Sequence, residues 1–391
     1  MADADILIAG AGAAGLSLAW ALTRPGQPPR SITLIDRDDK RANDRTWCFW
    51  ERGDNPFEEI VYRRWADLRF VTAAGRSVDL DLRGHVYKMI RGSDFYAHLR
   101  QRLEGVPGVR WVQAGIEDVT ESGEQAAIHL ADGRTLTARW AFTSLPMVKA
   151  VPPGRIWLWQ DFVGWTVRVD QPVFDPRRAT LMDFRVPQAV ETRFVYVLPL
   201  SAREALVEHT LFGAERLPVA AHEAALDAYV RGVLGLERFD ILDREHGAIP
   251  MTDAPPPRPG GAVVAIGTAG GASKPSTGYT FRRIQAQTGA IARNLAAGRP
   301  PLAGFAYGPR RFGWYDRALL NVLALGRRPG ARVFEDLFTR LPAGDVLDFL
   351  SETASVGQEL RVLAAGAPLP FMTAMADVFA RTLRGSAGGR R

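Results

Sequence analysis

Cysteine and long apolar runs are nearly absent from this sequence. Cys48 is the single cysteine among 391 residues, which excludes an internal disulfide and a zinc site built from cysteines. One uncharged segment, residues 6–22, follows two aspartates and is rich in glycine. A secretory signal begins with basic residues, and a membrane-spanning helix is longer. These absences predict a protein of a reducing compartment such as the bacterial cytoplasm, with no spanning helix.

Metal and hydrolase signatures are absent as well. The six histidines show no metal-ligand spacing, so no metal site is expected. Ser144 lacks the surrounding histidine and acid that would make it a nucleophile. The 47% hydrophobic and 24% charged residues are ordinary for a globular chain of one large or two interleaved domains.

The formal charge of +6 is compatible with an anionic partner, such as nucleic acid, acidic lipid headgroups or a phosphate-bearing cofactor. The arginines that produce it are scattered in pairs along the chain and form no basic run. We therefore interpret most of them as a solvated surface, and we expect no nucleic-acid partner.

A glycine motif near the N-terminus indicates a dinucleotide site. An apolar run typical of a buried parallel strand precedes Gly10-x-Gly12-x-x-Gly15, and a helical pattern follows. The glycines allow a tight turn, close approach of backbone amides to a pyrophosphate, and close packing of helix on strand. Asp36 closes the next strand, where its carboxylate can accept hydrogen bonds from ribose. Together with Ala14 inside the motif, these residues are predicted to bind the cofactor.

A second glycine loop favours FAD over NAD(P) as the tightly bound dinucleotide. An apolar strand pattern leads into Gly267, Thr268, Gly270 and Gly271, and in many flavoproteins such a late loop closes over the flavin. Thr268 stands where those proteins carry aspartate, so backbone amides would have to supply the contact. NAD(P)H is a candidate transient electron donor.

The patterns predict an α/β fold, with a Rossmann-type FAD-binding domain, an interleaved antiparallel-sheet substrate domain and C-terminal helices. Ser93 is expected to cap a helix that it begins, and Asp132-Gly133 to form a hairpin turn. The expected divisions are the first part of the FAD-binding domain at 1–150, the β-rich substrate domain at 151–255, the return to the FAD-binding domain at 256–300 and a helical region at 301–391.

Five ordered stretches carry a more specific signal. They are DRTWCFW at 44–50, YKMIRGSDF at 87–95, LVEHT at 206–210, IPMTD at 249–253 and IGTAGGASKPSTGYTF at 266–281. Together they resemble the bacterial lycopene β-cyclases, over a span from the first strand to about residue 325. The Cys-Asp-Gly-like segment of flavin monooxygenases is missing from the middle of the chain, which disfavours a hydroxylase.

The resemblance implies a redox-neutral cyclisation of lycopene that requires reduced FAD. An acid protonates C2 of the terminal isoprene unit, the C1–C6 bond closes, and loss of the C6 proton leaves a β-ionone ring, through γ-carotene to β-carotene. The essential carboxylate of the family lies in the stretch matching LVEHT, which makes Glu208 the expected catalytic acid. Asp253 is a candidate second acid or base. Arg45 is a candidate flavin contact, or alternatively a partner in a surface ion pair.

The pattern around Glu208 fits that role but also allows another. Protonating an alkene requires a water-shielded carboxyl group whose pKa is raised by burial, and Glu208 lies in an apolar strand pattern. The pattern alone equally allows a solvent-facing glutamate. His209 is expected on the opposite strand face. The aromatic residues of the substrate domain either form core or line a pocket that stabilises a cation: Trp157, Trp159, Phe162, Trp165, Phe194 and Tyr196.

Because a polyene resides in the bilayer, we expect a peripheral enzyme on the inner face of the membrane. Residues 301–312 and 314–320 combine arginines with aromatics, which suits lipid headgroups or ordinary packing on the core. Other enzymes of carotenoid synthesis are further candidate partners. The alternative function is a FAD-dependent prenyl-chain reductase or hydroxylase. The sequence leaves open which acyclic carotenoid is the substrate, whether one or both of its ends are cyclised, and which type of ring forms. It also leaves open the oligomeric state and whether NADH or NADPH is the donor.

Overall fold

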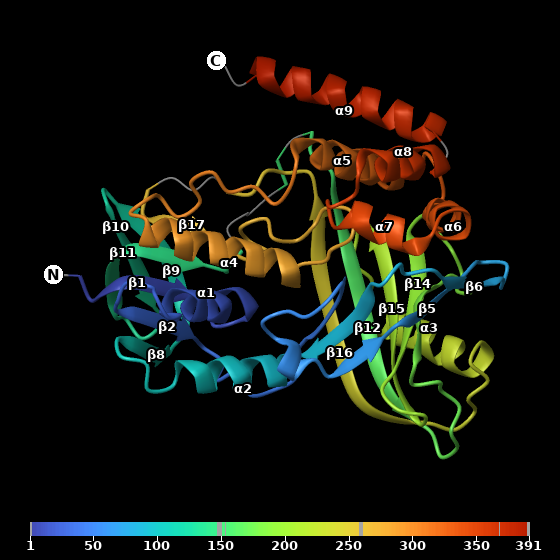
Figure 1. Cartoon of the computed structure of the whole chain (residues 1–391), viewed down its shortest axis with the longest axis horizontal. Coiled ribbons are helices and arrows are strands. Elements are labelled where there is room, and N and C mark those ends of the chain that lie inside the picture. Colours follow the sequence, from blue (N-terminus) through green and yellow to red (C-terminus); the bar gives the residue numbers. More distant parts are fainter. Residues whose placement is uncertain (1, 147–150, 153, 258–260, 367, 389–391) are drawn as a thin grey trace.

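The computed structural model describes residues 2–146, 151–152, 154–257, 261–366 and 368–388. Within them the strands form two seven-stranded sheets and one three-stranded sheet. In Figure 1 the first sheet lies at the left, the long strands of the second sheet stand at the right, and helices α5, α8 and α9 lie along the top. This mixed α/β arrangement confirms the expected fold class.

The first sheet is mostly parallel and has the strand order β8-β2-β1-β11-β10-β9, with β17 paired to β11. Ile6 and Ile8 of β1 pack against α1, α2 and α4, whereas Leu7 and Ala9 pack on the other face, which explains why the strand is apolar throughout. Its elements are β1 (Ala4–Ala9), α1 (Ala13–Thr23), β2 (Ile32–Asp36), α2 (Gly92–Leu103), β8 (Val109–Gln113), β9 (Ile116–Ser122), β10 (Gln125–Leu130), β11 (Thr135–Thr143), β17 (Val263–Ala265) and α4 (Phe281–Ala296).

The second sheet is largely antiparallel, with the order β16-β12-β15-β14-β13-β5-β6. One face packs against α3, through residues such as Val163, Val207 and Leu226. The other face contributes to the largest apolar cluster, together with the small sheet and α5–α7. Its elements are β5 (Asp67–Val71), β6 (Ser77–Leu80), β12 (Trp157–Arg168), β13 (Arg178–Asp183), β14 (Thr192–Pro199), β15 (Glu204–Gly213), α3 (Val219–Gly232) and β16 (Asp240–Thr252).

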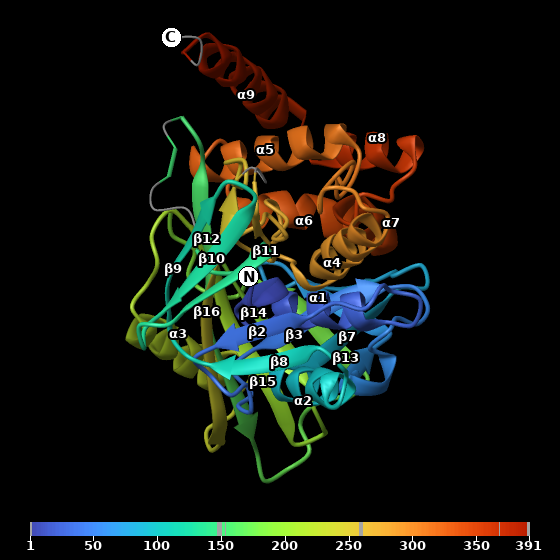
Figure 2. The same cartoon turned by 90° about the vertical axis from the view of Figure 1, so that its left-hand side faces the viewer.

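The small sheet and α5–α7 pack against the second sheet, and the C-terminal helices lie together at the top of Figure 2. The small sheet consists of β3 (Thr46–Glu51), β7 (Val86–Arg91) and β4 (Arg63–Trp65), and η1 (Glu58–Ile60) precedes β4. The helices are α5 (Arg310–Ala324), α6 (Gly330–Arg340), α7 (Ala343–Leu350), α8 (Val356–Ala365) and α9 (Pro368–Gly388). In the described chain, no one helix meets the length and apolarity of a membrane span; α8 and residues 368–382 of α9 do so only jointly, across a bend of 107°.

Two local expectations have different outcomes. The hairpin at Asp132-Gly133 is confirmed, because β10 and β11 pair across it and Gly133 has φ +86°. The Ser93 cap is wrong: α2 begins at Gly92, its N-cap is Arg91, and no side chain caps it. The Gly92 amide donates a hydrogen bond to the carbonyl oxygen of Arg45 at 2.7 Å. The start of the helix is therefore set by its packing against the segment around Arg45.

Sheet membership departs from the expected divisions in one place. β5 and β6 come from the first 150 residues, yet β5 pairs with β13 and extends the second sheet. The first segment of the chain therefore crosses between the two sheets. β16 is an edge strand whose exposed, proline-containing sequence carries no apolar alternation, so sequence patterning did not reveal it.

A buried polar cluster joins α3 to the second sheet. The Nδ1 atoms of His209 and His222 lie 2.9 Å apart, and Nε2 of His222 lies 3.1 Å from Oδ2 of Asp161. His209 thus points away from the Glu208 face, as expected. Burial, and then the charge of His222, lower the pKa of His209 from 6.5 to about 3.

This depressed pKa predicts acid sensitivity. In the unfolded protein His209 binds a proton below about pH 6.5, whereas in the folded protein its buried ring stays neutral down to about pH 3. Between these values the unfolded state holds more protons, so the free energy of unfolding should fall with falling pH by up to about 1.4 kcal/mol per unit. Urea unfolding between pH 7 and 5 should show a shallower pH slope for His209→Gln than for the unsubstituted protein. His246→Gln, at an exposed histidine, is the control; equal slopes for all three proteins would contradict the assignment.

Candidate active site

The turn between β1 and α1 forms a cradle that requires glycine. Gly10 has φ +99°, and a Cβ at Gly15 would lie only 1.9 Å from the Gly10 carbonyl oxygen. The start of α1 therefore packs directly on the turn, as the motif predicts. A Cβ at Gly12 would meet no atom within 4 Å, so the protein leaves space on that side of the turn.

The polar groups around this cradle fit a phosphate-bearing ligand. Gly12 is the N-cap of α1, no side chain caps the helix, and its first turn contains no acidic residue. The positive end of the helix dipole is therefore available to an anion. Asp36 ends β2, and its Oδ2 accepts a hydrogen bond from the Ala11 amide at 2.7 Å. This carboxylate lies beside the turn, at the place from which it would reach a ribose.

The second glycine loop meets the first. A Cβ at Gly267 would lie 2.8 Å from the Cβ of Ala14, so the loop packs on the first turn of α1. A Cβ at Gly270 would lie 2.3 Å from a backbone carbonyl oxygen, and Gly271 has φ +77°. The side chain of Thr268 is exposed. The structure therefore brings the predicted residues of both loops into one region.

Arg45 and Asp253, two other residues predicted for the site, make their contacts away from Glu208. The Arg45 side chain is 61% exposed, and its Nε lies 3.9 Å from Oδ2 of Asp44, which corresponds to the surface ion pair considered as the alternative. Asp253 follows the end of β16 and accepts a hydrogen bond from the Ile156 amide at 2.7 Å. It lies roughly 25 Å along the strand from the level of Glu208, given the rise per residue. This position does not favour Asp253 as an acid or base for the same ring.

Glu208 instead meets a second carboxyl group. Tyr196, Glu208, Gly164 and Glu245 stand in register on β14, β15, β12 and β16, and residues paired in this way project from the same face. A Cβ at Gly164 would meet Cγ of Glu245 at 3.1 Å. Because glycine leaves this position free, the carboxyl groups of Glu208 and Glu245 reach each other and are hydrogen-bonded.

The environment of the pair keeps Glu208 protonated. Burial, and then the charge of Glu245, raise the pKa of Glu208 to about 8, although Thr210 Oγ1 donates a hydrogen bond to it at 2.7 Å. Burial also raises the pKa of Glu245, and this rise is opposed by hydrogen bonds from Glu208 and from Thr46 Oγ1, the latter at 2.6 Å. Both side chains keep some accessible surface. At neutral pH the pair therefore presents a protonated carboxyl group, as a general acid requires.

Aromatic side chains lie close to the pair. The hydroxyl oxygens of Tyr87 and Tyr279 are 3.1 Å apart, and Tyr196 lies close enough to Tyr279 to influence its pKa. The ring of Trp50 lies 4.4 Å from that of Tyr279, in an edge-to-face arrangement. Burial raises the pKa of Tyr196 and Tyr279, so these hydroxyls stay neutral. Neutral, electron-rich rings attract a cation without supplying a strong nucleophile.

Only half of the six aromatic residues considered for the pocket share this face. Phe162, Phe194 and Tyr196 have the strand parity of Gly164 and Glu208. Trp165 has the opposite parity and packs in the cluster under α3. Trp157 and Trp159 share its parity, and their rings contact each other at 5.5 Å. A cluster in sequence is divided here by the alternation of side chains along β12.

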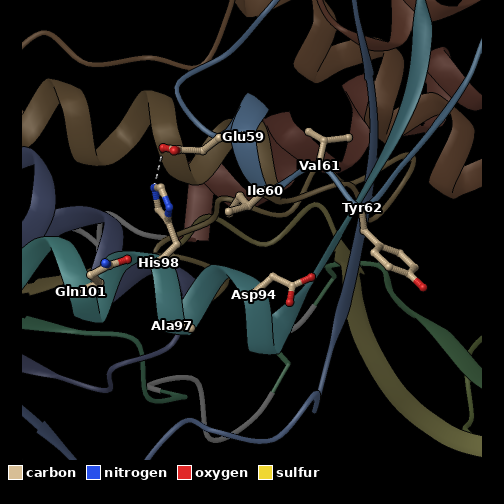
Figure 3. Close-up of a pocket in the computed structure, with 8 residues that line it drawn as sticks. All are labelled: Glu59, Ile60, Val61, Tyr62, Asp94, Ala97, His98 and Gln101. Atoms are coloured by element: carbon tan, nitrogen blue, oxygen red, sulfur yellow. Dashed lines mark ion pairs between the residues drawn. The ribbon is translucent and has the colours of Figure 1, made fainter.

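An open pocket elsewhere does not belong to this site. It has a volume of ≈ 460 Å³ and lies at the surface between η1 and α2 (Figure 3), where His98 Nε2 is 3.4 Å from Glu59 Oε1. Its lining shares no residue with the glycine loops or with the carboxyl pair. In the described part of the chain, no group of three His, Cys, Asp or Glu residues could hold a metal ion.

Sequence reasoning missed Glu245 altogether and gave no role to Tyr87 or Tyr279. The two tyrosines lie within stretches that carried the family resemblance, so those stretches were the available signal. Glu245 lies four residues before the stretch beginning at Ile249, on the strand that patterning did not reveal. Only the register across Gly164 connects it with Glu208.

The fold and the cradle define a dinucleotide-binding α/β protein whose second sheet carries a half-buried carboxyl pair. Two solved structures share the fold. A flavoprotein/dehydrogenase from Cytophaga hutchinsonii has a TM-score of 0.61 at 15% identity, covering 96% of this chain and 99% of its own. A geranylgeranyl bacteriochlorophyll reductase-like protein from Thermoplasma acidophilum has a TM-score of 0.59 at 14% identity, with the same coverages of 96% and 99%.

The sequence comparisons are more specific. The profile of the family described as lycopene cyclase protein matches residues 5–376, and the chain belongs to this family. The lycopene β-cyclase of Pseudescherichia vulneris is 27% identical, over 94% of this chain and 95% of its own length. That of Paracoccus sp. (strain N81106 / MBIC 01143) is 26% identical, over 95% and 96%. The expected family is confirmed.

The cradle geometry predicts a selective loss of cofactor. The Gly12 backbone has an extended conformation that valine accepts, and its Cβ would clash with no protein atom. Gly12→Val should therefore fold normally but fill the space for a pyrophosphate, lowering bound flavin about tenfold. Flavin absorbance per folded protein, with folding checked by circular dichroism, measures the effect. Gly313→Ala, in a helix and equally free of clashes, should retain flavin. Full flavin content in Gly12→Val would refute the placement.

Proposed function

We propose that the protein is a lycopene β-cyclase that uses Glu208 as the acid in a redox-neutral ring closure. The observation that carries the proposal is a pair of carboxyl groups, Glu208 and Glu245, that meet across Gly164 on an apolar, aromatic sheet face, where burial raises the pKa of Glu208. Alkene protonation requires such a group, because an exposed glutamate would be ionised at neutral pH. Relatives over the full length that are named lycopene β-cyclases support the same substrate.

The surroundings of Glu208 suit the steps that follow protonation. The Glu208 carboxyl donates its proton to C2 of the ψ-end, and the C5–C6 π electrons close the bond to C1. Positive charge then develops on C5, where the rings of Tyr196, Tyr279 and Phe162 would stabilise it by their electron-rich faces. The apolar walls exclude the water that would otherwise trap the cation as an alcohol. Loss of the C6 proton completes the β-ring.

FAD is the proposed cofactor. The cradle at Gly10, Gly12 and Gly15 would hold the pyrophosphate, Asp36 the adenosine ribose, and the loop from Gly267 would close over the remainder. When bound and reduced, FAD supplies negative charge that stabilises a nearby cation. We propose NAD(P)H as the transient donor that keeps it reduced. Because the ring closure is redox-neutral, NAD(P)H consumption should not scale with product.

The competing function is a FAD-dependent prenyl-chain reductase or hydroxylase. The fold allows it, since a structure of similar fold is described as reductase-like. The carboxyl pair favours the cyclase, because hydride transfer or oxygen insertion does not require a protonated carboxyl group of raised pKa. The two functions differ in product mass, which makes them directly separable.

Expression in a lycopene-accumulating bacterial host tests the function. The protein should convert lycopene to a cyclic isomer of unchanged mass, detected by chromatography and mass spectrometry. Glu208→Gln should be at least about a hundredfold less active, as expected when a general acid is removed, and it should keep its flavin. Unchanged lycopene beside an active control cyclase and a flavin-loaded protein would refute the proposal. A reduced or oxygenated product would support the competing function.

We further propose that α8 and α9 dock on the inner face of the membrane, where a polyene substrate is dissolved. Their exposed apolar side chains are Val356, Leu360, Leu369, Met372 and Phe379. Residues 301–320, where the sequence suggested the contact, have their large apolar side chains at least partly buried. An outer apolar face beside arginines such as Arg317, which stacks on Trp314 at 5.3 Å, suits the headgroup interface.

Vesicle binding tests the docking. In co-sedimentation with vesicles of phosphatidylethanolamine and phosphatidylglycerol, Leu360→Gln/Phe379→Gln should bind about tenfold more weakly, because two apolar side chains no longer enter the lipid. Val173→Gln, at an apolar side chain 51% exposed in the loop that follows β12, should bind normally. Equal binding by all three proteins would exclude α8 and α9 as the docking surface.

A further inference from the structure

The acid of the proposed reaction does not stand alone. We propose that Glu245 is a positioning residue that accepts the hydrogen bond of the Glu208 carboxyl and keeps one proton within the pair. This inference rests on the proposed function and extends it, because neither the family resemblance nor the sequence pattern assigns Glu245 any role.

The sheet geometry requires a special arrangement for the two groups to meet. Glu208 lies on β15 and Glu245 on β16, with β12 between them. Strands two positions apart are separated by roughly 9.5 Å, so side chains on them do not normally touch. Gly164 occupies the intervening register position, and a Cβ there would come within 3.1 Å of Glu245 Cγ and 3.0 Å of Leu206 Cδ1. The two glutamates meet across this glycine.

Each carboxyl group also has a fixed hydrogen-bond donor of its own. Thr210 Oγ1 donates to Oε1 of Glu208, and Thr46 Oγ1 donates to Oε2 of Glu245. Thr46 comes from β3, so the small sheet holds Glu245 from the opposite side. With one oxygen of each group occupied, the others are left to share a proton.

The charged and titratable groups around the pair support this proton count. The groups that act electrostatically with the pair are Cys48 on β3, Tyr196 on β14, Tyr279 before α4 and Asp243 on β16. These groups are neutral or acidic, and no cation is among them in the described structure. Tyr87 on β7 contacts Cys48 and Tyr279. With no cation to compensate a second negative charge, a singly protonated pair is the stable form.

The same pair can close the proton cycle. When Glu208 gives its proton to C2, an O–H bond breaks, a C–H bond forms, and two adjacent carboxylates are left. Their mutual repulsion makes them more basic than a single carboxylate. When the C6–H bond breaks, its electron pair forms the ring double bond and the proton returns to the carboxyl pair. Each turnover thus begins and ends with one shared proton, and the product has the mass of the substrate.

The pH profile of cyclisation tests the role of Glu245. The acid form of Glu208 is lost as the pH rises through about 8. Glu245→Gln removes a negative charge that helps to hold this proton, so the alkaline limb should move down by about one pH unit or more, with at least about fivefold less activity at pH 8. Activity near pH 6 should be largely retained. Glu245→Asp should restore most of the profile, and Gly164→Ala, which pushes the carboxyls apart with both charges intact, should shift it in the same direction as Glu245→Gln.

Asp161→Asn is the matched control, because it neutralises a buried carboxylate of the same sheet on the face toward α3. It should reduce stability without moving the alkaline limb. An unmoved limb in Glu245→Gln, with activity retained, would overturn the inference. Infrared titration of the substrate-free holoprotein provides an independent measurement. A carboxyl band that titrates near pH 8 should be absent from Glu208→Gln, and in Glu245→Gln the pH at which it titrates should be lower. If that pattern holds while lycopene is left unconverted, the carboxyl pair stands and the proposed function fails.

Discussion

Two carboxyl groups within hydrogen-bond reach inside an apolar environment must share a proton, because two adjacent carboxylates would repel each other strongly where water cannot screen them. This constraint explains several features of the second sheet. A glycine at position 164 lets the groups meet, two threonine hydroxyls satisfy their outer oxygens, and neutral tyrosines rather than lysines or arginines surround them. The result is a carboxyl group that keeps its proton at neutral pH, as a general acid requires.

The remaining architecture links the glycine cradle to the aromatic face that carries the carboxyl pair. The loop that begins at Gly267 continues to Tyr279, so one segment contributes to both places. Its position is fixed by a buried ion network, in which Lys274 Nζ lies 2.9 Å from Asp316 and 2.7 Å from Glu352. These partners belong to α5 and to the turn after α7. Removing Lys274 would leave the buried carboxylate of Asp316 without its cation, so the C-terminal helices are coupled to this loop as well as to the fold.

The structural relatives show why the fold does not decide the chemistry. Proteins described as reductase-like and as a dehydrogenase share it at low identity. The reaction therefore depends on particular side chains, and in this chain the second sheet carries the carboxyl pair. A glycine cradle serves many reactions, whereas a protonated carboxyl on an aromatic face suits the initiation of a carbocation reaction.

Local sequence determined the parts that depend on near neighbours in the chain. The glycine motif, its strand and helix, Asp36 and the hairpin at Asp132-Gly133 were readable because backbone conformation and apolar periodicity are local properties. The resemblance also led to Glu208. The tertiary structure alone decided that Glu208 faces the apolar side of the sheet, that three of six clustered aromatics face away from it, and that Glu245 is its partner. These facts depend on strand register, which is set by contacts among segments far apart in the chain and leaves no local pattern in a polar edge strand such as β16.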